Sequence, residues 1–343
     1  MKAFALVARG EFAWANVPDE PPPGPGQVVV RPTACGVCAS DVHYWRKGNI
    51  GDQVITEYPY AVGHECAGVV AEVGDGVSSV SPGDRVAVEP GIPCGECRPC
   101  REGRQNICPD VVFLGTPMVQ GAMRESILTI EENVEPIPDE MSFAAAAMCE
   151  PLGVGIHAAR LADVRRGENV AIFGAGPIGL STAVACRARD AGRIILAEPV
   201  PERRRLAEEM GFETLDIALD PVEAIRDLTD GGADVAFEAA GDVRAIDWTV
   251  RSPRLGARVC IIGIPSEETV PVPINAVRRA ELTIYNARRA NRTLADAVRL
   301  INGPARDLTR MCTHSFPLDE APAAFELSAA RADGVVKAML EFD

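Results

Sequence analysis

Short apolar runs, separated by Gly and Pro, dominate the first 130 residues of the chain. MKAFALVARG at the start predicts a first strand, and further strands are predicted at VVVRPTA (28–34), HECAGVVAEVG (64–74) and DRVAVEP (84–90). The stretch PDEPPPGPG (18–26) is rich in turn residues and predicts a connector. We therefore expect an antiparallel, barrel-like β domain in this half of the chain.

The pattern changes near residue 150, where strand-like runs begin to alternate with helix-like segments. A helix is predicted over 144–162, interrupted at Pro151. Beyond it the pattern predicts strands at 168–174, 193–198, 233–240, 257–264 and 282–287, and helices at 177–190 and 201–210. Such alternation is typical of a parallel sheet with helices on both faces. The tail predicts a helix (293–302), a strand (311–315), a helix (319–330) and a last strand (334–342).

Length and charge narrow the class of protein. A chain of 343 residues is long for one core, so two domains are expected. The chain has 34 Lys+Arg against 49 Asp+Glu, a net charge of −15, which argues against a nucleic-acid partner. We find no apolar run of about 18 residues that would predict a membrane span. The opening apolar run is too short for a signal peptide, so a cytoplasmic location is expected.

Four cysteines stand within fifteen residues in GIPCGECRPCREGRQNIC, at the spacing C-x2-C-x2-C-x7-C. They are Cys94, Cys97, Cys100 and Cys108. Four thiolates on one short segment match the closed tetrahedral site of a structural zinc. Disulfides are the alternative, but a chain without a signal peptide favours reduced thiols and a metal.

The sequence Gly174-Ala-Gly176-Pro-Ile-Gly179 has the form G-x-G-x-x-G, directly after a predicted strand and at the start of a predicted helix. In this context it predicts a dinucleotide-binding turn, with the pyrophosphate at the helix N-terminus. Glu198 ends the next predicted strand, where a carboxylate accepts hydrogen bonds from ribose hydroxyls and favours NAD over NADP. Arg203 to Arg205 leave NADP open as the cofactor, because arginine can hold a 2′-phosphate.

Upstream, Cys35-Gly-Val-Cys38-Ala-Ser40-Asp41-Val-His43 and Gly63-His64-Glu65 offer ligands for a second metal. One Cys, one His and one carboxylate would leave the open position that a catalytic zinc needs. Spacing alone does not choose between Cys35 and Cys38.

Taken together, these residues resemble the zinc-dependent medium-chain dehydrogenase/reductase superfamily, and most closely its sorbitol/xylitol (polyol) dehydrogenases. The motifs that carry the resemblance span about residues 2–342: CASDVHYWRKGNIG, YPYAVGHECAGVVAEVG, GDRVAVEPG, the four-cysteine segment, FLGTP, MCEPLGVGIHA, GAGPIGL and THSFPL. The resemblance implies an α/β protein with a GroES-like, β-barrel-type catalytic domain over 1–152 and 290–343. It implies a Rossmann domain, a doubly wound parallel sheet that binds NAD, over 153–289.

The resemblance also implies the ligands of the catalytic zinc. Cys38 is the thiolate ligand because it stands just before the [GA]-[ST]-D step of the family, and Cys35 is a neighbour. His64 is the second ligand and Glu65 the third, with water completing the site. Glu150 of CEPL matches a carboxylate that can contact the metal directly.

Other residues take their expected roles from the same resemblance. Ser40 matches the hydroxyl beside the zinc-bound oxygen, and His43 the end of a proton relay. The expected substrate contacts are Tyr44, Phe113, Thr116, Glu150 and Arg288. The expected cofactor contacts are Gly174, Gly176, Pro177, Ile178, Gly179, Glu198, Arg203, Gly263, Ile264 and Arg288.

The implied activity is oxidation of a secondary alcohol of a polyol to a ketose, with two zinc ions per chain and NAD. A zinc alkoxide would form as the proton leaves through Ser40, the nicotinamide ribose and His43, and hydride would pass to NAD. A homotetramer, or a homodimer, is expected from the resemblance, with a small-molecule polyol as the substrate and no membrane partner.

Two departures from the polyol pattern keep rivals open. The family's Arg-Tyr pair reads Arg288-Arg289 here, and the four-cysteine segment is absent from some animal sorbitol dehydrogenases. AEPVPERRRLA is similar to the threonine and butanediol dehydrogenase branches, so an L-threonine 3-dehydrogenase or a 2,3-butanediol dehydrogenase is the main alternative. A non-catalytic dinucleotide-binding protein, or a zinc protein that binds nucleic acid, is the remote one.

Overall fold

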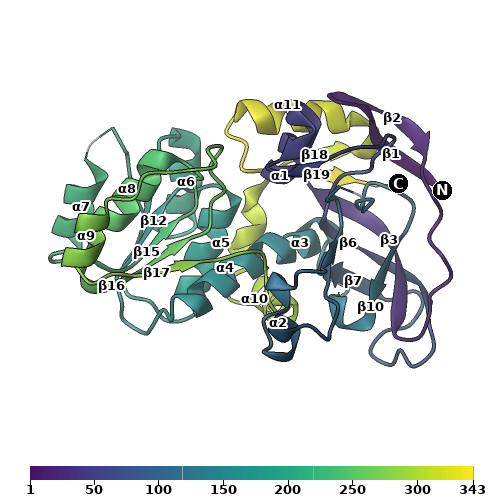
Figure 1. Cartoon of the computed structure of the whole chain (residues 1–343), viewed down its shortest axis with the longest axis horizontal. Coiled ribbons are helices and arrows are strands. Elements are labelled where there is room, and N and C mark those ends of the chain that lie inside the picture. The colour runs from purple at the N-terminus through teal and green to yellow at the C-terminus, as the bar shows by residue number, and fades with distance from the viewer. Residues whose placement is uncertain (118, 219, 343) are drawn as a thin grey trace. The chain divides into compact units, whose positions relative to one another are not determined.

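The computed structural model describes residues 1–117, 119–218 and 220–342. The chain divides into two compact units (Figure 1). The first unit consists of Met1–Glu150, Leu294–Gly303 and Cys312–Asp343, and the second of Pro151–Thr293 and Pro304–Met311. Asp343, the last residue of the predicted catalytic domain, lies outside the described residues.

The first unit is built around the long strand β3 (Gln27–Gly36). This strand pairs antiparallel with β6 (Glu65–Val73), β10 (Ile127–Ile130) and β19 (Lys337–Glu341). The sheet order is β11-β7-β6-β3-β19-β18, with β7 at Arg85–Val88 and β11 at Val134–Pro136. Short pairs stand beside it: β1 (Lys2–Ala8) with β2 (Glu11–Asn16), β4 (Asn49–Ile50) with β5 (Gln53–Val54), and β8 (Gly91–Ile92) with β9 (Val112–Phe113).

One pair of strands in this unit departs from the antiparallel expectation. β18 (Cys312–Pro317) runs parallel to β19. Helix α11 (Ala321–Ala330) connects them and contributes the buried Phe325 to the core. A strand that returns through a helix arrives in the same direction, whereas a tight turn would reverse it.

The second unit has the parallel sheet that the alternating pattern predicts. Its order is β14-β13-β12-β15-β16-β17, and all its pairs are parallel. The strands are β12 (Val170–Phe173), β13 (Ile194–Ala197), β14 (Glu213–Leu215), β15 (Ala233–Glu238), β16 (Pro253–Ile261) and β17 (Thr283–Asn286). The central strands β12 and β13 are fully buried, as expected of a sheet covered on both faces.

Helices follow the strands of this sheet in turn (Figure 1). They are α5 (Pro177–Arg187), α6 (Pro201–Glu209), α7 (Pro221–Leu228), α8 (Val243–Arg251) and α9 (Ile274–Arg279). Proline stands in the first turn of α5, α6 and α7, where its missing N–H costs no hydrogen bond.

The helix predicted over 144–162 is two helices, and the break is not at Pro151. Helix α3 (Phe143–Ala147) ends before Met148, and α4 (Cys149–Leu161) carries Pro151 in its first turn. A proline ring clashes with the carbonyl four residues earlier, here that of Ala147, and cannot donate to it. The interruption therefore lies one turn before the proline that causes it.

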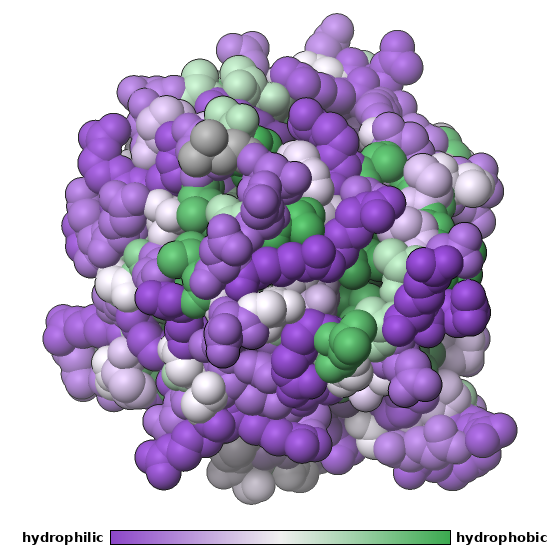
Figure 2. Space-filling model, turned by 90° about the vertical axis from the view of Figure 1, so that its left-hand side faces the viewer, coloured by the Kyte–Doolittle hydropathy of each residue, from purple (hydrophilic) through white to green (hydrophobic). Residues whose placement is uncertain are grey.

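The face shown in Figure 2 is mainly hydrophilic, with smaller hydrophobic areas between polar side chains. Leu255, Ile264 and Ile274 are among the exposed apolar side chains of the second unit, at 67–74% exposure. Among the described residues, no helix has both the length and the apolar character needed to cross a membrane.

Candidate metal centres and dinucleotide site

Helix α1 (Ala39–Lys47) begins at Cys38 through an unusual capping box. The Cys38 sulfur accepts a hydrogen bond from the backbone of Asp41, and the Asp41 carboxylate accepts one from Cys38 N at 3.1 Å. A reciprocal pair of this kind satisfies two backbone donors at a helix start. It also holds the thiol at a defined position.

The same Asp41 carboxylate reaches the loop that carries His64. Its Oδ1 accepts from Gly63 N at 3.2 Å and lies 3.3 Å from His64 Nδ1. Asp41 is 1% exposed, so this contact is shielded from water. A carboxylate on one ring nitrogen orients a histidine so that its other nitrogen can bind a metal.

Cys38, His64 and Glu65 converge, and one donor atom of each lies within 4.8 Å of the others. Burial lowers the pKa of His64, but the charges of Asp41 and Cys38 raise it, and the pKa ends well above its ordinary value. A cation bound at this position would take the place of the proton on the ring. Sulfur, nitrogen and oxygen donors in this number fit a zinc with one open position.

The structure distinguishes the two candidate thiols that sequence spacing left open. Cys35 lies on β3 directly opposite Cys66 of β6 and is fully buried. Burial, then the nearby Cys66, raises the pKa of the Cys35 thiol well above its ordinary value. Cys35 is not in the group of three donors, whereas Cys38 is.

Glu150, at the start of α4, is buried but does not join that group of donors. Burial raises the pKa of Glu150 to about 7, and the negative charge of Glu65 adds to this, while His64 opposes it. Glu150 is thus electrostatically coupled to the cluster, and its role as a ligand remains a prediction.

Two residues of this centre were not predicted from the sequence. Asp41 orients His64, and the signal was its position three residues after a helix cap, where acidic side chains are favoured. Lys337 of β19 forms a buried ion pair with Glu65. A lone lysine in the apolar run GVVKAML was the signal, because charged side chains are rarely buried without a partner.

The four cysteines also converge, and their sulfur atoms lie within 4.8 Å of one another. They lie around the short helices α2 (Arg98–Arg101) and η1 (Gln105–Ile107). Backbone N–H groups point at the sulfurs: Cys94 N donates to Cys108 Sγ and Cys97 N to Cys94 Sγ. Hydrogen bonds from the backbone of Glu96 and Cys97 lower the pKa of Cys94 to about 7, which favours the thiolate of this residue, whereas burial raises the pKa of Cys100.

One predicted substrate residue of the first unit, Phe113, lies beside the three-donor group. Phe113 is buried, and its ring centroid lies 5.5 Å from that of His64. Thr116 Oγ1 donates to Phe113 O at 2.7 Å. Ser40, His43 and Tyr44 share α1, and at i, i+3 and i+4 they lie on one face.

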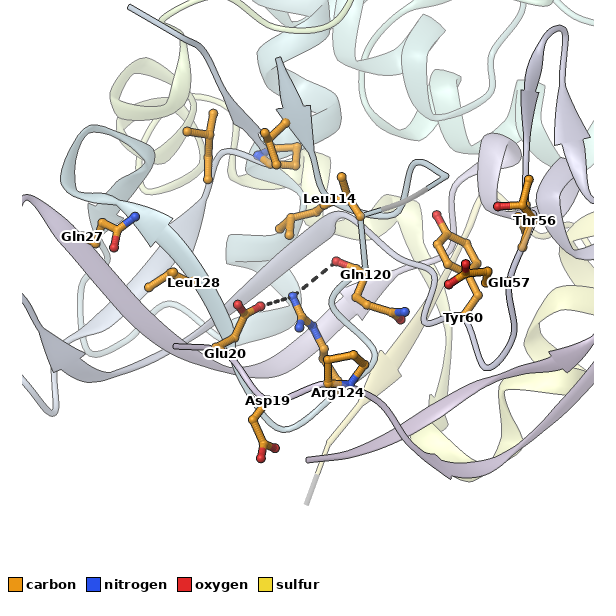
Figure 3. A pocket seen from close by; sticks show the side chains of 16 residues that line it. Asp19, Glu20, Gln27, Thr56, Glu57, Tyr60, Leu114, Gln120, Arg124 and Leu128 are labelled. Carbon is orange, nitrogen blue, oxygen red and sulfur yellow. Dashed lines mark hydrogen bonds and ion pairs between the residues drawn. The ribbon is translucent and has the colours of Figure 1, made fainter. Parts of the chain in front are cut away.

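A separate pocket of about 710 Å³ lies in the first unit (Figure 3). Its lining includes Val112 and Leu114 but not Phe113 between them, nor any described member of the donor groups. In Figure 3 Arg124 reaches toward Glu20, 2.5 Å away, and toward the Gln120 carbonyl at 3.3 Å. This pocket is therefore not the predicted substrate site.

In the second unit, β12 leads through residues 174–176 into α5, as the G-x-G-x-x-G pattern predicts. Gly174 has φ 109°, which favours glycine. A Cβ on Gly179 would lie 1.9 Å from Gly174 O, so the helix can pack against the turn only without a side chain there. Pro177 and Ile178 open the helix, whose free N–H groups can receive a phosphate.

Glu198, one residue after β13, ties this turn in place. Its carboxylate accepts from Ala175 N at 2.7 Å and from Val200 N at 3.0 Å. The terminal guanidinium nitrogen of Arg203 lies 3.6 Å from where a Cβ on Gly176 would stand. The ribose contact of Glu198 stays a prediction, and the structure shows that its carboxylate holds the turn.

The remaining predicted cofactor residues lie elsewhere in this unit. Gly263 is close to the buried Glu238, because a Cβ there would lie 2.4 Å from Glu238 Oε2. Glu238 itself accepts from Ala240 N and Gly241 N and was not predicted from the sequence. Ile264 and Arg288 are exposed.

Comparison with known proteins shows which family the two parts of the chain resemble. The family model described as "Alcohol dehydrogenase GroES-like domain" matches residues 24–139, and "Zinc-binding dehydrogenase" matches residues 177–303. Sorbitol dehydrogenase of Bacillus subtilis (strain 168) is 38% identical, over 99% of this chain and 97% of that protein.

Two solved structures extend the comparison. An Escherichia coli oxidoreductase/dehydrogenase of unknown specificity superposes with a TM-score of 0.93 at 32% identity, covering 100% of this chain and 99% of its own. The 2R,3R-butanediol dehydrogenase of Bacillus subtilis gives a TM-score of 0.88 at 28% identity, with 99% of each chain covered. The predicted fold class is confirmed by these matches.

Proposed function

The chain belongs to the zinc-dependent medium-chain dehydrogenase/reductase superfamily, in its polyol branch, and we propose that it oxidises a secondary hydroxyl of a polyol to a ketone with NAD. It is an oxidoreductase of the zinc-dependent alcohol dehydrogenase family, and the family's cofactors are zinc and NAD(P). The polyol substrate, the preference for NAD and the mechanism are our proposal.

One observation carries the proposal: Cys38, His64 and Glu65 form a three-donor group in a chain that also has a glycine-rich dinucleotide turn. Three protein ligands leave one metal position for substrate, which is how catalytic zinc differs from structural zinc. The four-cysteine group has no such free position.

The residues of the first unit have three separate roles: metal binding, proton transfer and exclusion of water. Zinc held by Cys38, His64 and Glu65 supplies Lewis-acid polarisation of the substrate hydroxyl. Ser40 receives the hydroxyl proton and passes it toward His43. Phe113, packed beside His64, shields the reacting centre from bulk water.

The second unit binds the dinucleotide through the turn at 174–179. Glu198 supports NAD as the acceptor, because its carboxylate is fixed by two backbone N–H groups and would repel a 2′-phosphate. Arg204 is engaged with the carbonyls of Glu198 and Pro199 and with Asp216, so it already has partners other than a phosphate.

A vicinal diol such as 2,3-butanediol is the alternative substrate. It is supported by the similarity to 2R,3R-butanediol dehydrogenase and by Arg288-Arg289, which replaces the Arg-Tyr pair of the polyol branch. L-Threonine is a further alternative, because either arginine could bind its carboxylate. The homotetramer and the cytoplasmic location stay predictions.

The test is a cofactor-reduction assay on the zinc-loaded protein. NAD is supplied with xylitol, D-sorbitol, galactitol, 2,3-butanediol or L-threonine in turn, and the absorbance of the reduced cofactor is followed. We expect kcat/KM to be highest for a polyol. Turnover confined to butanediol or threonine would overturn the polyol assignment while leaving the zinc and cofactor proposals standing. Repeating the series with NADP tests the acceptor preference.

A further inference from the structure

Lys337 and Glu65 form an ion pair inside the first unit. The Lys337 ammonium donates to Glu65 Oε1 at 2.7 Å and lies 2.6 Å from Oε2. Its third contact is with Val37 O at 3.1 Å. The side chains are 3% and 2% exposed, so water does not screen the pair.

The pairing of the strands makes this contact possible. Glu65 on β6 stands opposite Gly36 on β3, and Gly36 in turn stands opposite Met339 on β19. A Cβ on Gly36 would lie only 2.2 Å from Glu65 Oε2. Because Gly36 has no side chain, the lysine of β19 can reach across β3 to the carboxylate of β6.

Glu65 therefore has two possible partners. Its carboxylate belongs to the group of donors with Cys38 and His64, and it also faces a buried ammonium at hydrogen-bond distance. Cys38 and Glu150 are also close enough to Lys337 for their charges to act on it. A metal ion bound by Cys38, His64 and Glu65 would share the Glu65 carboxylate with the ammonium group of Lys337.

We propose that Lys337 is a positioning residue that competes with the catalytic metal for the Glu65 carboxylate and so keeps this ligand exchangeable. This inference rests on the proposed metal centre of Cys38, His64 and Glu65. Lys337 lowers the electron density that Glu65 offers, and its charge opposes that of a divalent ion in a buried setting. Asp41 acts in the opposite sense, because a carboxylate beside His64 strengthens that ligand.

The test measures metal release rather than turnover. Co²⁺ is loaded into the full-length protein, and its transfer to an excess of chelator is followed through its visible absorption. We expect Lys337→Met to slow release from the three-donor site by ~10–100-fold, the size typical of groups just outside a metal's ligands. The visible spectrum of bound Co²⁺ should change as well, because Glu65 then has the metal as its main partner.

Matched variants separate charge from packing. Lys337→Arg keeps the charge and should release Co²⁺ at nearly the wild-type rate. Lys337→Gln keeps a hydrogen-bond donor without the charge and should behave like Lys337→Met, which covers the case that the apolar variant does not fold. Asp41→Asn should show the reverse effect, with faster release. The His64→Ala protein, loaded in the same way, supplies the signal of the four-cysteine group for subtraction.

The outcomes distinguish this inference from the proposed function. Unchanged or faster release from both Lys337→Met and Lys337→Gln would overturn the competition and leave Lys337 a purely structural partner. If wild-type protein shows no Co²⁺ signal beyond that of His64→Ala, the metal centre itself fails, and the proposed function with it.

Discussion

His43 is the residue on whose charge the proposed proton path depends. Burial, and then the positive charge of Lys47, lower the pKa of His43 below its ordinary value of 6.5. The ring is therefore neutral at pH 7 and able to accept a proton. Protonated His43 cannot accept the proton of the substrate. Because the pKa of His43 is lowered, kcat/KM should fall as the pH drops through a value below 6.5.

Two substitutions test this pH dependence. His43→Gln should remove the acid limb of the kcat/KM profile and lower turnover by up to ~100-fold, the lower end of what a positioned acid–base group contributes. Lys47→Met removes a charge that lowers the pKa of His43, so its acid limb should move to higher pH. Profiles for both variants that match the wild type would exclude His43 from the relay.

At the scale of elements, the segment formed by β12, the glycine turn and α5 depends on close contact between backbone atoms. A Cβ on Gly179 would stand 1.9 Å from Gly174 O, and a backbone atom can yield only if the helix moves. Gly179→Ala should therefore weaken NAD binding by at least ~10-fold and lower stability by ~1–3 kcal/mol, as overpacking does. Calorimetric titration with NAD and chemical unfolding measure the two effects.

Gly176→Ala is the matched control for the same turn. Its Cβ would find its nearest neighbour, a nitrogen of Arg203, at the ordinary contact distance of 3.6 Å, and Gly176 has φ −75°, which alanine adopts freely. This variant should keep wild-type stability, and only NAD binding should suffer, where the backbone approaches the pyrophosphate. Equal loss of stability in both variants would contradict the packing argument for Gly179.

At the scale of the whole molecule, both candidate metal sites lie in the first unit and are formed by separate segments. We expect two zinc ions per chain that bind independently. His64→Ala should remove one equivalent and abolish turnover, while the four-cysteine group keeps its zinc. Cys100→Ser should remove the other equivalent and leave the three-donor group loaded. Elemental analysis of the purified proteins measures this, and loss of both ions in either variant would contradict independent sites.

The sequence alone predicted those features that depend on residues close to one another in the chain. The four cysteines and the glycine turn are contiguous segments, so their spacing already limits which donors can meet. The alternation of strands and helices predicted the parallel sheet, because hydrophobic periodicity acts within each segment. In the same way the run at 144–162 predicted helix, although its interruption lies at Met148 rather than at Pro151.

Only the tertiary structure decided how distant segments meet. Choosing Cys38 over Cys35 from geometry requires knowing that Cys35 faces Cys66 across the sheet, and strand register is not encoded in local spacing. Lys337 lies 272 residues from Glu65 and reaches it only because β3 places a glycine between their strands. The ligand and glycine motifs are formed by residues close in the chain, so the sequence alone predicts them. The residues that act on those ligands, such as Lys337 on Glu65, are brought there by pairing between strands that are distant in the chain.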